Sequence, residues 1–354
     1  MTAPSPIRWI DRPEIAIAFI DSLPDAPIAL DTEFMRTQTY YAELALVQVQ
    51  CGDALALIDP CAPGVVQVLG PLLANARDKI LHSASEDLEV LLRALGAVPA
   101  PLFDTQIAAT LCGAALPPSY QKLVASELGV ELPKGATRSD WLQRPLSEEQ
   151  MHYAADDVRY LPALHARLFA RLSELGRLPW LYEEGERAAT KARDVDANPH
   201  LKVRSAERLT AAQQQRLWRL LTWREREARA RNRPRTWILD NAIAQRVALL
   251  DKPSPQALAS ACTIDGRAQP RLAEKLERIV MAAPAEDELV IPLASELNDS
   301  EKARAREIKT LVDTRAGALG ISADFLLPRR GIEHWAREGE LPSDLRGWRS
   351  EVLA

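Results

Sequence analysis

Carboxylates at the end of a strand are the first residues in this sequence that could do chemistry. Asp31-Thr32-Glu33 follows the apolar run Ile28–Leu30, and residues i and i+2 of a strand point to the same face. Two carboxylates held about 5 Å apart repel by about 1 kcal/mol in water and by several times more where solvent is excluded. A solvated strand edge would tolerate this repulsion, whereas a shared cation would remove it.

Two further acidic segments are predicted on helices. Asp87 lies in the first turn of a helix that begins near Ser85, where an acidic residue also complements the helix dipole. Tyr153 and Asp157 are four residues apart on another predicted helix, about 40° apart on one face, whereas Asp156 points away and is expected to be solvated. An ordinary hydrogen-bonded surface pair would have the same spacing as Tyr153 and Asp157.

Taken together, the four carboxylates indicate a metal site. The sequence has no cluster of cysteines and histidines beside them, and carboxylate oxygens are the ligands that suit Mg²⁺ or Mn²⁺. Two such ions about 4 Å apart can hold a phosphodiester and activate a water for in-line displacement. A phosphate substrate could not approach so acidic a pocket without cations.

Alternating strands and helices are expected to position these residues over the first 110 positions. Strands are predicted at 28–30, 44–50, 54–58 and 79–81, with a hairpin turn at Gly52-Asp53, and helices at 65–76 and 85–95. Antiparallel strands followed by crossover helices predict a mixed α/β sheet. From Ser147 onward the pattern becomes almost wholly helical.

The second half of the chain predicts two small helical modules. Helices are expected at 209–231, 236–249, 255–261 and 270–282, then at 300–319, 322–335 and 341–353, with connections at 194–201 and 283–292. Trp237-Ile-Leu and Phe325-Leu-Leu occupy similar places after the first helix of each block. We interpret this as a weak internal repeat of about 70 residues.

Composition and charge narrow the class of protein. The 354 residues are 47% hydrophobic and 26% charged, which predicts two or three globular domains and excludes disordered or collagen-like chains. Four scattered cysteines and the absence of a long apolar run favour a reduced cytoplasmic protein without a signal peptide or membrane span. The net charge of −5 conceals an acidic block at 1–200, with 27 acidic against 17 basic residues, beside a basic block at 201–278, with 17 basic against 8 acidic residues.

The basic block suggests a nucleic-acid partner. Residues 223–235 contain six arginines and two glutamates, and for residues 224–227 a solvated helix face with internal ion pairs is an equal alternative. Arg229, Arg231, Arg233 and Arg235 are interpreted as lacking nearby acids, and we expect them to contact phosphates. Binding by residues 202–278 should therefore weaken with salt, and truncation near residue 200 should raise KM more than it lowers kcat.

The order of the acidic motifs resembles a known superfamily. Asp-Thr-Glu, then His-Ser-Ala-Ser-Glu-Asp, then Tyr-Ala-Ala-Asp-Asp is similar to the three motifs of the DEDD 3′→5′ exonucleases, and the stretches 29–41, 81–91, 103–106 and 139–146 resemble the ribonuclease D family. The tail resembles two tandem HRDC (helicase and ribonuclease D C-terminal) modules. The resemblance implies a ribonuclease-H-like α/β exonuclease domain at 1–197, a mixed sheet flanked by helices, followed by two all-α HRDC-type domains at 202–283 and 293–354.

The resemblance also implies a role for each motif residue. Asp31, Glu33 and Asp157 would ligate one Mg²⁺ or Mn²⁺ ion, with Asp31 bridging to a second ion held by Asp87. Tyr153, assisted by Glu33, would orient the water that attacks the terminal phosphodiester and releases a nucleoside 5′-monophosphate. His82, in the second motif, is expected to contact the nucleic acid.

One ambiguity concerns the third motif. Residues 152–157 also fit H-x-A-x-x-D, the motif of the branch that uses histidine as its base. On a continuous helix His152 lies about 140° from Asp157, away from the metal-facing side, so Tyr153 is favoured. A helix that began only after residue 152 would loosen that geometry.

The leading functional hypothesis is a metal-dependent 3′→5′ exoribonuclease. Its expected substrates are tRNA precursors or other RNA 3′ ends, and it is expected to be a cytoplasmic monomer with no membrane or obligate protein partner. A DNA-directed exonuclease of the same superfamily and a non-catalytic HRDC-based tether are the alternatives. A tether would be expected to lack one of the four carboxylates, and all four are present.

Overall fold

The computed structural model describes residues 6–133, 139–194, 196–264, 266–283 and 290–354. The chain divides into two compact units, each described by itself below. The first unit contains residues 1–35, 42–194 and 299–354, and the second contains residues 36–41 and 195–298. The expected connection at 283–292 falls largely on 284–289, which lie outside the described residues.

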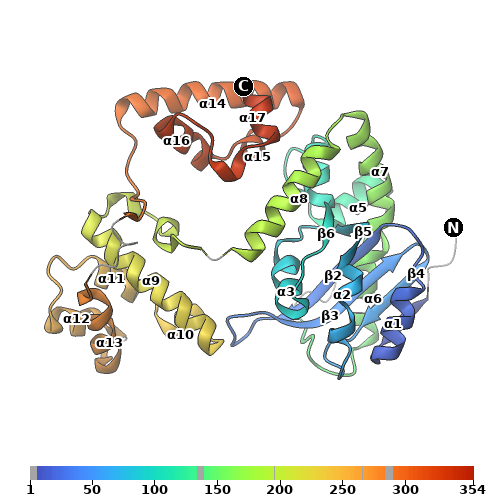
Figure 1. Ribbon diagram of the computed structural model, residues 1–354, viewed down its shortest axis with the longest axis horizontal. Helices are drawn as coiled ribbons and strands as arrows, with labels where there is room; N and C mark the ends of the chain where they lie inside the picture. The colour runs from blue at the N-terminus through green and yellow to red at the C-terminus, as the bar shows by residue number, and fades with distance from the viewer. Residues whose placement is uncertain (1–5, 134–138, 195, 265, 284–289) are drawn as a thin grey trace. The chain divides into compact units, whose positions relative to one another are not determined.

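A six-stranded mixed sheet forms the centre of the first unit (Figure 1), and it confirms the predicted fold class. The strand order is β1-β4-β3-β2-β5-β6, in which β2–β3 and β3–β4 are antiparallel and the other pairs are parallel. Gly52-Asp53 forms the expected two-residue hairpin between β3 and β4. The strands are β1 Ile7–Ile10, β2 Ile28–Met35, β3 Glu43–Cys51, β4 Ala54–Ile58, β5 Ala74–Leu81 and β6 Ala100–Asp104.

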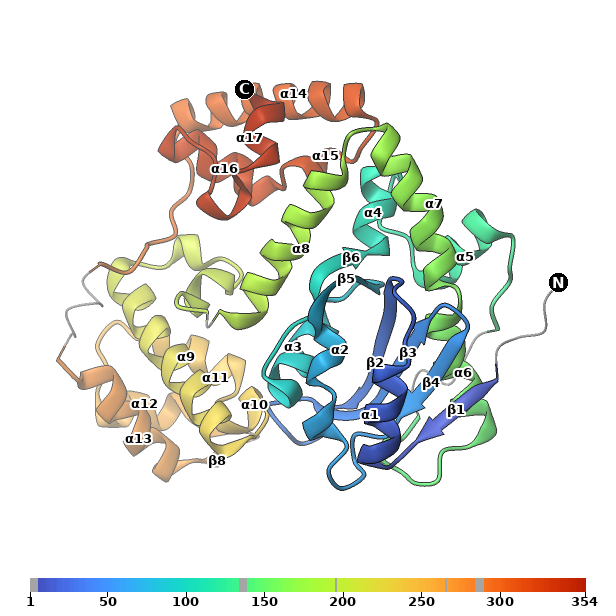
Figure 2. The ribbon, with the colours of Figure 1, turned by 45° about the vertical axis from the view of Figure 1, so that its right-hand side comes forward.

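Helices cover both faces of this sheet (Figure 2) because β2 and its neighbours carry apolar residues on alternating sides. Ile28 and Leu30 pack with α1 and α3, whereas Ala29 packs with α6 and α7. The helices of this part are α1 Pro13–Asp21, α2 Gly70–Leu73, α3 Ser85–Leu95, α4 Thr105–Leu111, α5 Tyr120–Leu128, α6 Glu148–Arg159, α7 Leu161–Glu174 and α8 Leu178–Arg193.

Two features of the N-terminal half differ from the sequence-based expectation. The helix predicted at 65–76 is wrong: the structure has a 3₁₀ turn at Val66–Val68, the short helix α2, and then β5 from Ala74. The strands β1 and β6 and the helix α1 were not predicted. β5 contains Lys79, which is buried because its ammonium group donates to the carbonyl oxygens of Asn75, Arg77 and Ala100 at 2.6–2.8 Å.

The C-terminal module, residues 299–354, packs against α8 within the first unit. Its helices are α14 Asp299–Leu319, α15 Ala323–Leu326, α16 Arg329–Glu338 and α17 Trp348–Leu353, with a 3₁₀ turn at Ser343–Leu345. Trp348 stacks on Trp180 with ring centroids 4.6 Å apart, and its indole N–H donates to Glu184 at 2.8 Å. Glu184 also pairs with Arg349, of which 3% is exposed. This module therefore shares a core with the sheet-bearing part of the unit.

The second unit is helical apart from one two-stranded ribbon, β7 Thr263–Ile264 and β8 Arg267–Ala268. Its helices are α9 Ala211–Arg231, α10 Arg235–Ile238, α11 Asn241–Ala248, α12 Pro255–Ala261 and α13 Pro270–Met281, preceded by 3₁₀ turns at Pro199–Lys202 and Ala206–Arg208. Leu217, Leu220, Ile243, Leu258 and Leu276 lie in its apolar core.

The repeat predicted from the sequence has a structural counterpart. Each block begins with a 21-residue helix, α9 or α14, and continues with a four-residue helix, α10 or α15. Trp237 lies in α10 and Phe325 in α15, so the two similar tripeptides fall at the same place in each block. Among the helices of the described ranges, none combines the length and apolar character needed to cross a membrane.

Candidate active site

Three carboxylates converge between the sheet and α6. Asp31 and Glu33 lie on the same side of β2 as Ala29, the side covered by α6, and Asp157 comes from the last turn of α6. One carboxylate oxygen from each of Asp31, Glu33 and Asp157 lies within 4.8 Å of the others. The pairing of β2 with β3 shifts register directly after Glu33, and such bulges re-aim side chains beside functional sites.

Asp87 belongs to the same electrostatic neighbourhood. It lies in the first turn of α3, as predicted, and 7% of the residue is exposed. Its carboxylate accepts a 2.5 Å hydrogen bond from the hydroxyl of Thr32, the residue between Asp31 and Glu33. Its charge is the largest electrostatic contribution to the raised pKa of Asp31.

Burial and mutual repulsion make these carboxylates hold protons tightly. Burial, followed by the charges of Asp87, Asp157 and Glu33, raises the pKa of Asp31 well above its usual range. Burial, followed by the neighbouring acids, raises the pKa of Glu33 to about 8 and that of Asp157 to about 7. Burial raises the pKa of Asp87 to about 6, although its hydrogen bond with Thr32 opposes the shift. A site that resists negative charge this strongly suits a bound cation.

The donor set fits a hard divalent cation. All the converging groups are carboxylates, and among the described residues this is the one group of three or more potential acidic, cysteine or histidine ligands whose ligand atoms lie that close together. Oxygen-only sets favour Mg²⁺, Mn²⁺ or Ca²⁺ over zinc or copper. The fold and the donor set therefore support binding of a divalent metal ion.

Tyr153 lies on the same face of α6 as Asp157. α6 begins at Glu148, so residue 152 is already inside the continuous helix, and the condition that would have loosened the geometry of His152 does not arise. The Tyr153 phenol lowers the pKa of Asp157, against the larger effect of burial, and burial, followed by the charges of the neighbouring acids, raises the pKa of Tyr153 well above its usual range. The phenol therefore stays protonated and keeps its O–H available as a donor.

The segment 139–146 holds Tyr153 in place. Trp141, of which 2% is exposed, packs on the Tyr153 ring with centroids 6.0 Å apart. Arg144 anchors this segment through two hydrogen bonds to Asp59, from Nε at 2.7 Å and from Nη2 at 2.6 Å, and a third to the carbonyl of Ala45 at 2.6 Å. A bidentate arginine–carboxylate pair fixes orientation as well as distance.

A cavity of about 300 Å³ opens beside this face of α6. His152, Asp156 and Glu149 line it with Tyr153 and Asp157, and the remaining wall comes from Gln121, Leu132 and Pro133. Asp156, which was expected to be solvated, also pairs with Arg159 at 2.9 Å. The cavity places apolar and polar surface directly next to the carboxylate cluster.

His82 lies outside the carboxylate group, in the turn before α3. Its Nδ1 is 2.9 Å from the Thr105 hydroxyl, and its ring centroid lies 5.6 Å from that of Tyr120. Burial lowers the pKa of His82, although the charge of Asp104 opposes the shift. His82 is therefore a neutral, partly buried side chain in a polar turn.

Several residues that support the site were not singled out from the sequence. Asp104 accepts the backbone N–H groups of Ser83 and Ala84 at 3.1 and 2.9 Å and also caps α4. The Tyr120 hydroxyl donates to the carbonyl of Asp156 at 2.9 Å. Gln48 pairs with Asp31 across the β2–β3 ladder and is fully buried. Asp104 could have been found, because it lies within the motif stretch 103–106, whereas Gln48 and Tyr120 acquire their positions only through tertiary structure.

The four arginines proposed for phosphate contact lie in the second unit, and the expectation that they lack nearby acids is wrong for three of them. Arg229 and Arg235 pair with Glu225 at 3.1 and 2.7 Å. Arg231 pairs with Glu227 at 2.6 Å, and the guanidinium of Arg233 lies 5.8 Å from the centre of the Trp237 ring. Two of the three glutamate contacts have i, i+4 spacing, which the sequence already displayed.

Known proteins resemble this chain over nearly its whole length. A family model described as a 3′-5′ exonuclease matches residues 7–173. The chain is 43% identical to ribonuclease D of Xanthomonas oryzae pv. oryzae, covering 98% of this chain and 96% of that protein. It is 35% identical to ribonuclease D of Escherichia coli strain K12, covering 92% and 90% of the two chains.

A solved structure agrees with these sequence comparisons. The crystal structure of Escherichia coli RNase D, described as an exoribonuclease involved in structured RNA processing, superposes with a TM-score of 0.83 at 31% sequence identity. The superposition covers 98% of this chain and 96% of that one. The likeness therefore includes the helical tail as well as the sheet. From the sequence identity, the coverage and the shared architecture together, the chain belongs to the ribonuclease D family of 3′→5′ exoribonucleases.

Proposed function

We propose that the carboxylate cluster is the catalytic centre and binds two Mg²⁺ or Mn²⁺ ions. Asp31, Glu33 and Asp157 would hold one ion, and Asp31 and Asp87 the other. The observation that carries this proposal is the convergence of three carboxylate oxygens within 4.8 Å. When bound, such ions neutralise phosphate charge and activate water. The carboxylates of this chain hold the ions, and their cluster defines the place of cleavage.

We propose that Tyr153 orients the attacking water and that Glu33 assists it. In support, the Tyr153 hydroxyl remains protonated, Tyr153 lines the same cavity as Asp157, and Trp141 packs on the Tyr153 ring. Such a phenol donates one hydrogen bond and still has acceptor capacity for a water. His152 is assigned a contact role at the cavity instead, because it lines that cavity beside Tyr153.

The assignment of Tyr153 is tested by two variants of the full-length protein. Tyr153→Phe keeps the ring against Trp141 and removes the hydroxyl, and we expect it to lower kcat by about 100-fold, the scale of a lost positioned proton-transfer group. His152→Ala is expected to change kcat by less than about threefold. A large loss of kcat only in the histidine variant would reverse the two roles.

We further propose that the 300 Å³ cavity receives the 3′-terminal nucleoside. Leu132 and Pro133 offer apolar surface for a base, and Glu149 and His152 offer polar atoms for the ribose hydroxyls. Glu149→Gln is expected to lower the RNA-over-DNA ratio of kcat/KM by about fivefold, the value of about one hydrogen bond. Glu148→Gln is the matched control, because Glu148 is exposed and does not line the cavity.

RNA binding is proposed for the second unit, which we interpret as the first HRDC-type domain, at 202–283; the second would span 293–354. Arg231 supports phosphate contact better than Arg229, since the Arg231 side chain is 57% exposed, compared with 31% for Arg229. Deleting everything after about residue 200 would also remove the C-terminal module, which shares the core of the first unit. Arg231→Ala in the full-length chain is the cleaner test, and it should raise KM for RNA more than it lowers kcat.

One digestion experiment separates the proposed classes of substrate. We propose tRNA precursors and other structured RNA 3′ ends as substrates of a cytoplasmic, monomeric enzyme. A labelled RNA and a DNA oligonucleotide of the same sequence would be incubated with and without Mg²⁺. Metal-dependent release of nucleoside 5′-monophosphates from RNA supports the proposal, and preferential release from DNA supports a DNA-directed enzyme. No metal-dependent release from either would leave the non-catalytic tether as the better hypothesis.

A further inference from the structure

The segment 36–41, between β2 and β3, forms a compact unit with helices that lie far from it in the sequence. It groups with residues 195–298 and not with the strands on either side of it. Tyr40 is 6% exposed, although it lies in a short connection where an exposed tyrosine would be expected. Its partners come from the end of α9 and the start of α10.

The hydroxyl of Tyr40 uses all of its hydrogen-bonding capacity. It donates to Glu225 and accepts from Arg229 Nε and Arg235 Nη2, both at 2.9 Å. A phenol has one donor and two acceptor positions. The ring is also in contact with charge, because the Arg235 and Arg229 guanidinium carbons lie 4.5 and 5.5 Å from its centre. The same two arginines thus contact both the ring and the hydroxyl of Tyr40.

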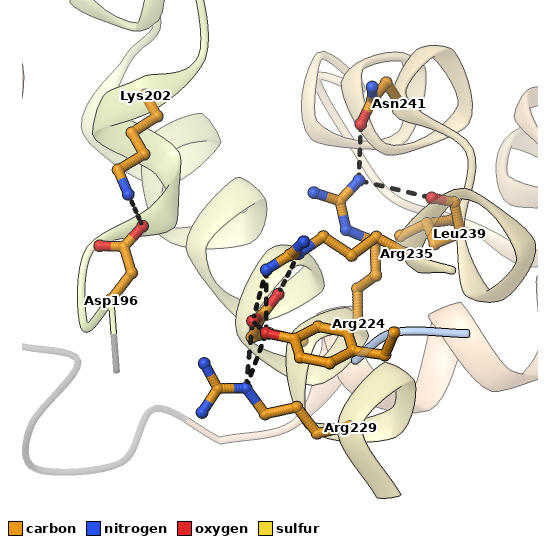
Figure 3. Close-up of polar contacts among 9 residues, drawn as sticks. Asp196, Lys202, Arg224, Arg229, Arg235, Leu239 and Asn241 are labelled. Carbon is orange, nitrogen blue, oxygen red and sulfur yellow. Dashed lines mark hydrogen bonds and ion pairs between the residues drawn. The ribbon is translucent and has the colours of Figure 1, made fainter. Parts of the chain in front are cut away.

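Glu225 holds those two arginines in position. Arg235 donates to it from Nε at 2.7 Å and from Nη2 at 3.1 Å, and Arg229 donates at 3.1 Å. Figure 3 shows the guanidinium groups of Arg229 and Arg235 close to each other. Although burial opposes the shift, the hydrogen bonds from Arg235 and Tyr40 lower the pKa of Glu225 to about 2. The cluster stays charged across the physiological range, so its contacts do not depend on protonation.

Asn232 recognises the backbone of the same segment. It follows the last residue of α9 in the left-handed conformation, with φ at 46°. Its side-chain carbonyl accepts the backbone N–H groups of Tyr40 and Tyr41 at 3.1 and 3.0 Å. Asparagine tolerates this conformation, and glycine tolerates it better. A glycine at position 232 would therefore keep the helix end and remove only the acceptor.

We infer that residues 36–41 are a docking segment that ties the second unit to the strand bearing Asp31 and Glu33, and that this attachment positions long RNA for cleavage. β2 ends at Met35, and the docking segment begins at the next residue. The second unit is therefore attached to the catalytic strand as well as through the chain near residue 195 and near residue 298. An additional attachment raises the effective concentration of an RNA held by the second unit at the carboxylate cluster.

The inference rests on the proposed function in one respect, namely that the second unit binds RNA and the carboxylate cluster cleaves it. It assigns to Tyr40 and Asn232 a positioning role and no contact with the reacting atoms. A substrate too short to reach the second unit should not depend on them. A long RNA should depend on them through KM, because its distant part is held by the second unit.

The test uses the full-length protein with Asn232→Gly and Tyr40→Ala, and with Gln38→Ala, an exposed position of the same segment, as control. Hydrogen exchange of the Tyr40 and Tyr41 amides reports docking directly. Cleavage of a long structured RNA and of a dinucleotide reports the consequence. We expect Asn232→Gly to speed exchange of both amides at least tenfold and to raise KM for the long RNA about tenfold. Its kcat/KM for the dinucleotide, and every value of the control variant, should change less than twofold.

Three outcomes would overturn the inference. Unchanged exchange in both variants would show that the segment is not docked through these residues, and faster exchange with an unchanged KM for long RNA would show that docking does not position substrate. An equal loss on the dinucleotide and the long RNA would also refute it, since that pattern indicates damage to β2. If the wild type releases no mononucleotides at all, the proposed function fails, while the exchange measurement still decides whether the segment is docked.

Discussion

The clustered carboxylates should make the metal-free protein less stable as the pH rises. Burial, followed by neighbouring acids, raises the pKa of Glu33 from 4.5 to about 8 and that of Asp157 from 3.8 to about 7. A carboxyl group with a higher pKa in the folded state binds its proton more tightly when folded. Its stabilising contribution is complete below the unfolded pKa, near 4, and is lost as the pH rises through the folded value. The loss should therefore extend from about pH 4 to about pH 8.

The size of the effect follows from the shift of Glu33. One pKa unit corresponds to about 1.4 kcal/mol, so a rise from 4.5 to about 8 gives a loss of about 5 kcal/mol across the window. Asp157 does not add its full shift, because part of the Glu33 shift comes from the charge of Asp157. A divalent cation needs the deprotonated carboxylates, so Mg²⁺ should stabilise the protein more at about pH 8 than at about pH 5.

Hydrogen exchange of the β2 and β3 amides is the appropriate assay, because it reports the first unit by itself. It would be measured in EDTA and in Mg²⁺ across this pH range, after correction for intrinsic exchange rates. Glu33→Gln should flatten most of the EDTA profile, whereas Glu148→Gln, at an exposed position of α6, should leave it unchanged. The comparison with Glu33→Gln is necessary because Lys79 also titrates in this pH range. Burial lowers the pKa of Lys79 to about 8. Metal-free stability that is constant or increases with pH, in the wild type relative to Glu33→Gln, would refute the reasoning.

Two further predictions concern the contacts that support the site. Glu184→Gln leaves the buried Arg349 without its charged partner; we expect about 3–5 kcal/mol of destabilisation, seen as lost exchange protection in residues 299–354. Replacing both residues by methionine should recover much of the lost stability. If it recovers none, the destabilisation does not come from an unpaired Arg349. Arg144→Lys keeps the charge but not the bidentate pair with Asp59. We expect kcat to fall about tenfold, because the segment that carries Trp141 loosens; an unchanged kcat would show that this segment does not position the catalytic helix.

The order of the acidic motifs and the alternation of strands allowed most of the first unit to be predicted. Asp31 and Glu33 were expected on one face because strand side chains alternate, and the structure places both on the side covered by α6. Tyr153 and Asp157 were expected on one face of a helix, and both lie on α6 and line the same cavity. These predictions succeeded because they depend on residues two or four positions apart.

Predictions failed where tertiary contacts overrode local pattern. The strand predicted at 79–81 begins at Ala74 in the structure, and three backbone carbonyls accept hydrogen bonds from the ammonium group of the buried Lys79. The segment 65–76 is apolar enough for a helix, but α2 ends at Leu73 and the chain continues as β5. The burial of Tyr40 could not be predicted from the sequence, because the partners of its side chain lie 185–195 residues away.

The arginines of the second unit show why the sum of charges is a poor measure of a binding surface. Residues 201–278 contain 17 basic and 8 acidic residues, which suggested a surface ready for a polyanion. Arg229 and Arg235, however, are occupied by Glu225 and by the Tyr40 hydroxyl. Their charge stabilises a contact within the unit, and a phosphate would have to displace a carboxylate to reach their bonded nitrogens. Arg231 also pairs with a glutamate, Glu227, but 57% of its side chain is exposed. A basic segment that looks uniform in the sequence thus combines arginines that differ in exposure and in their partners.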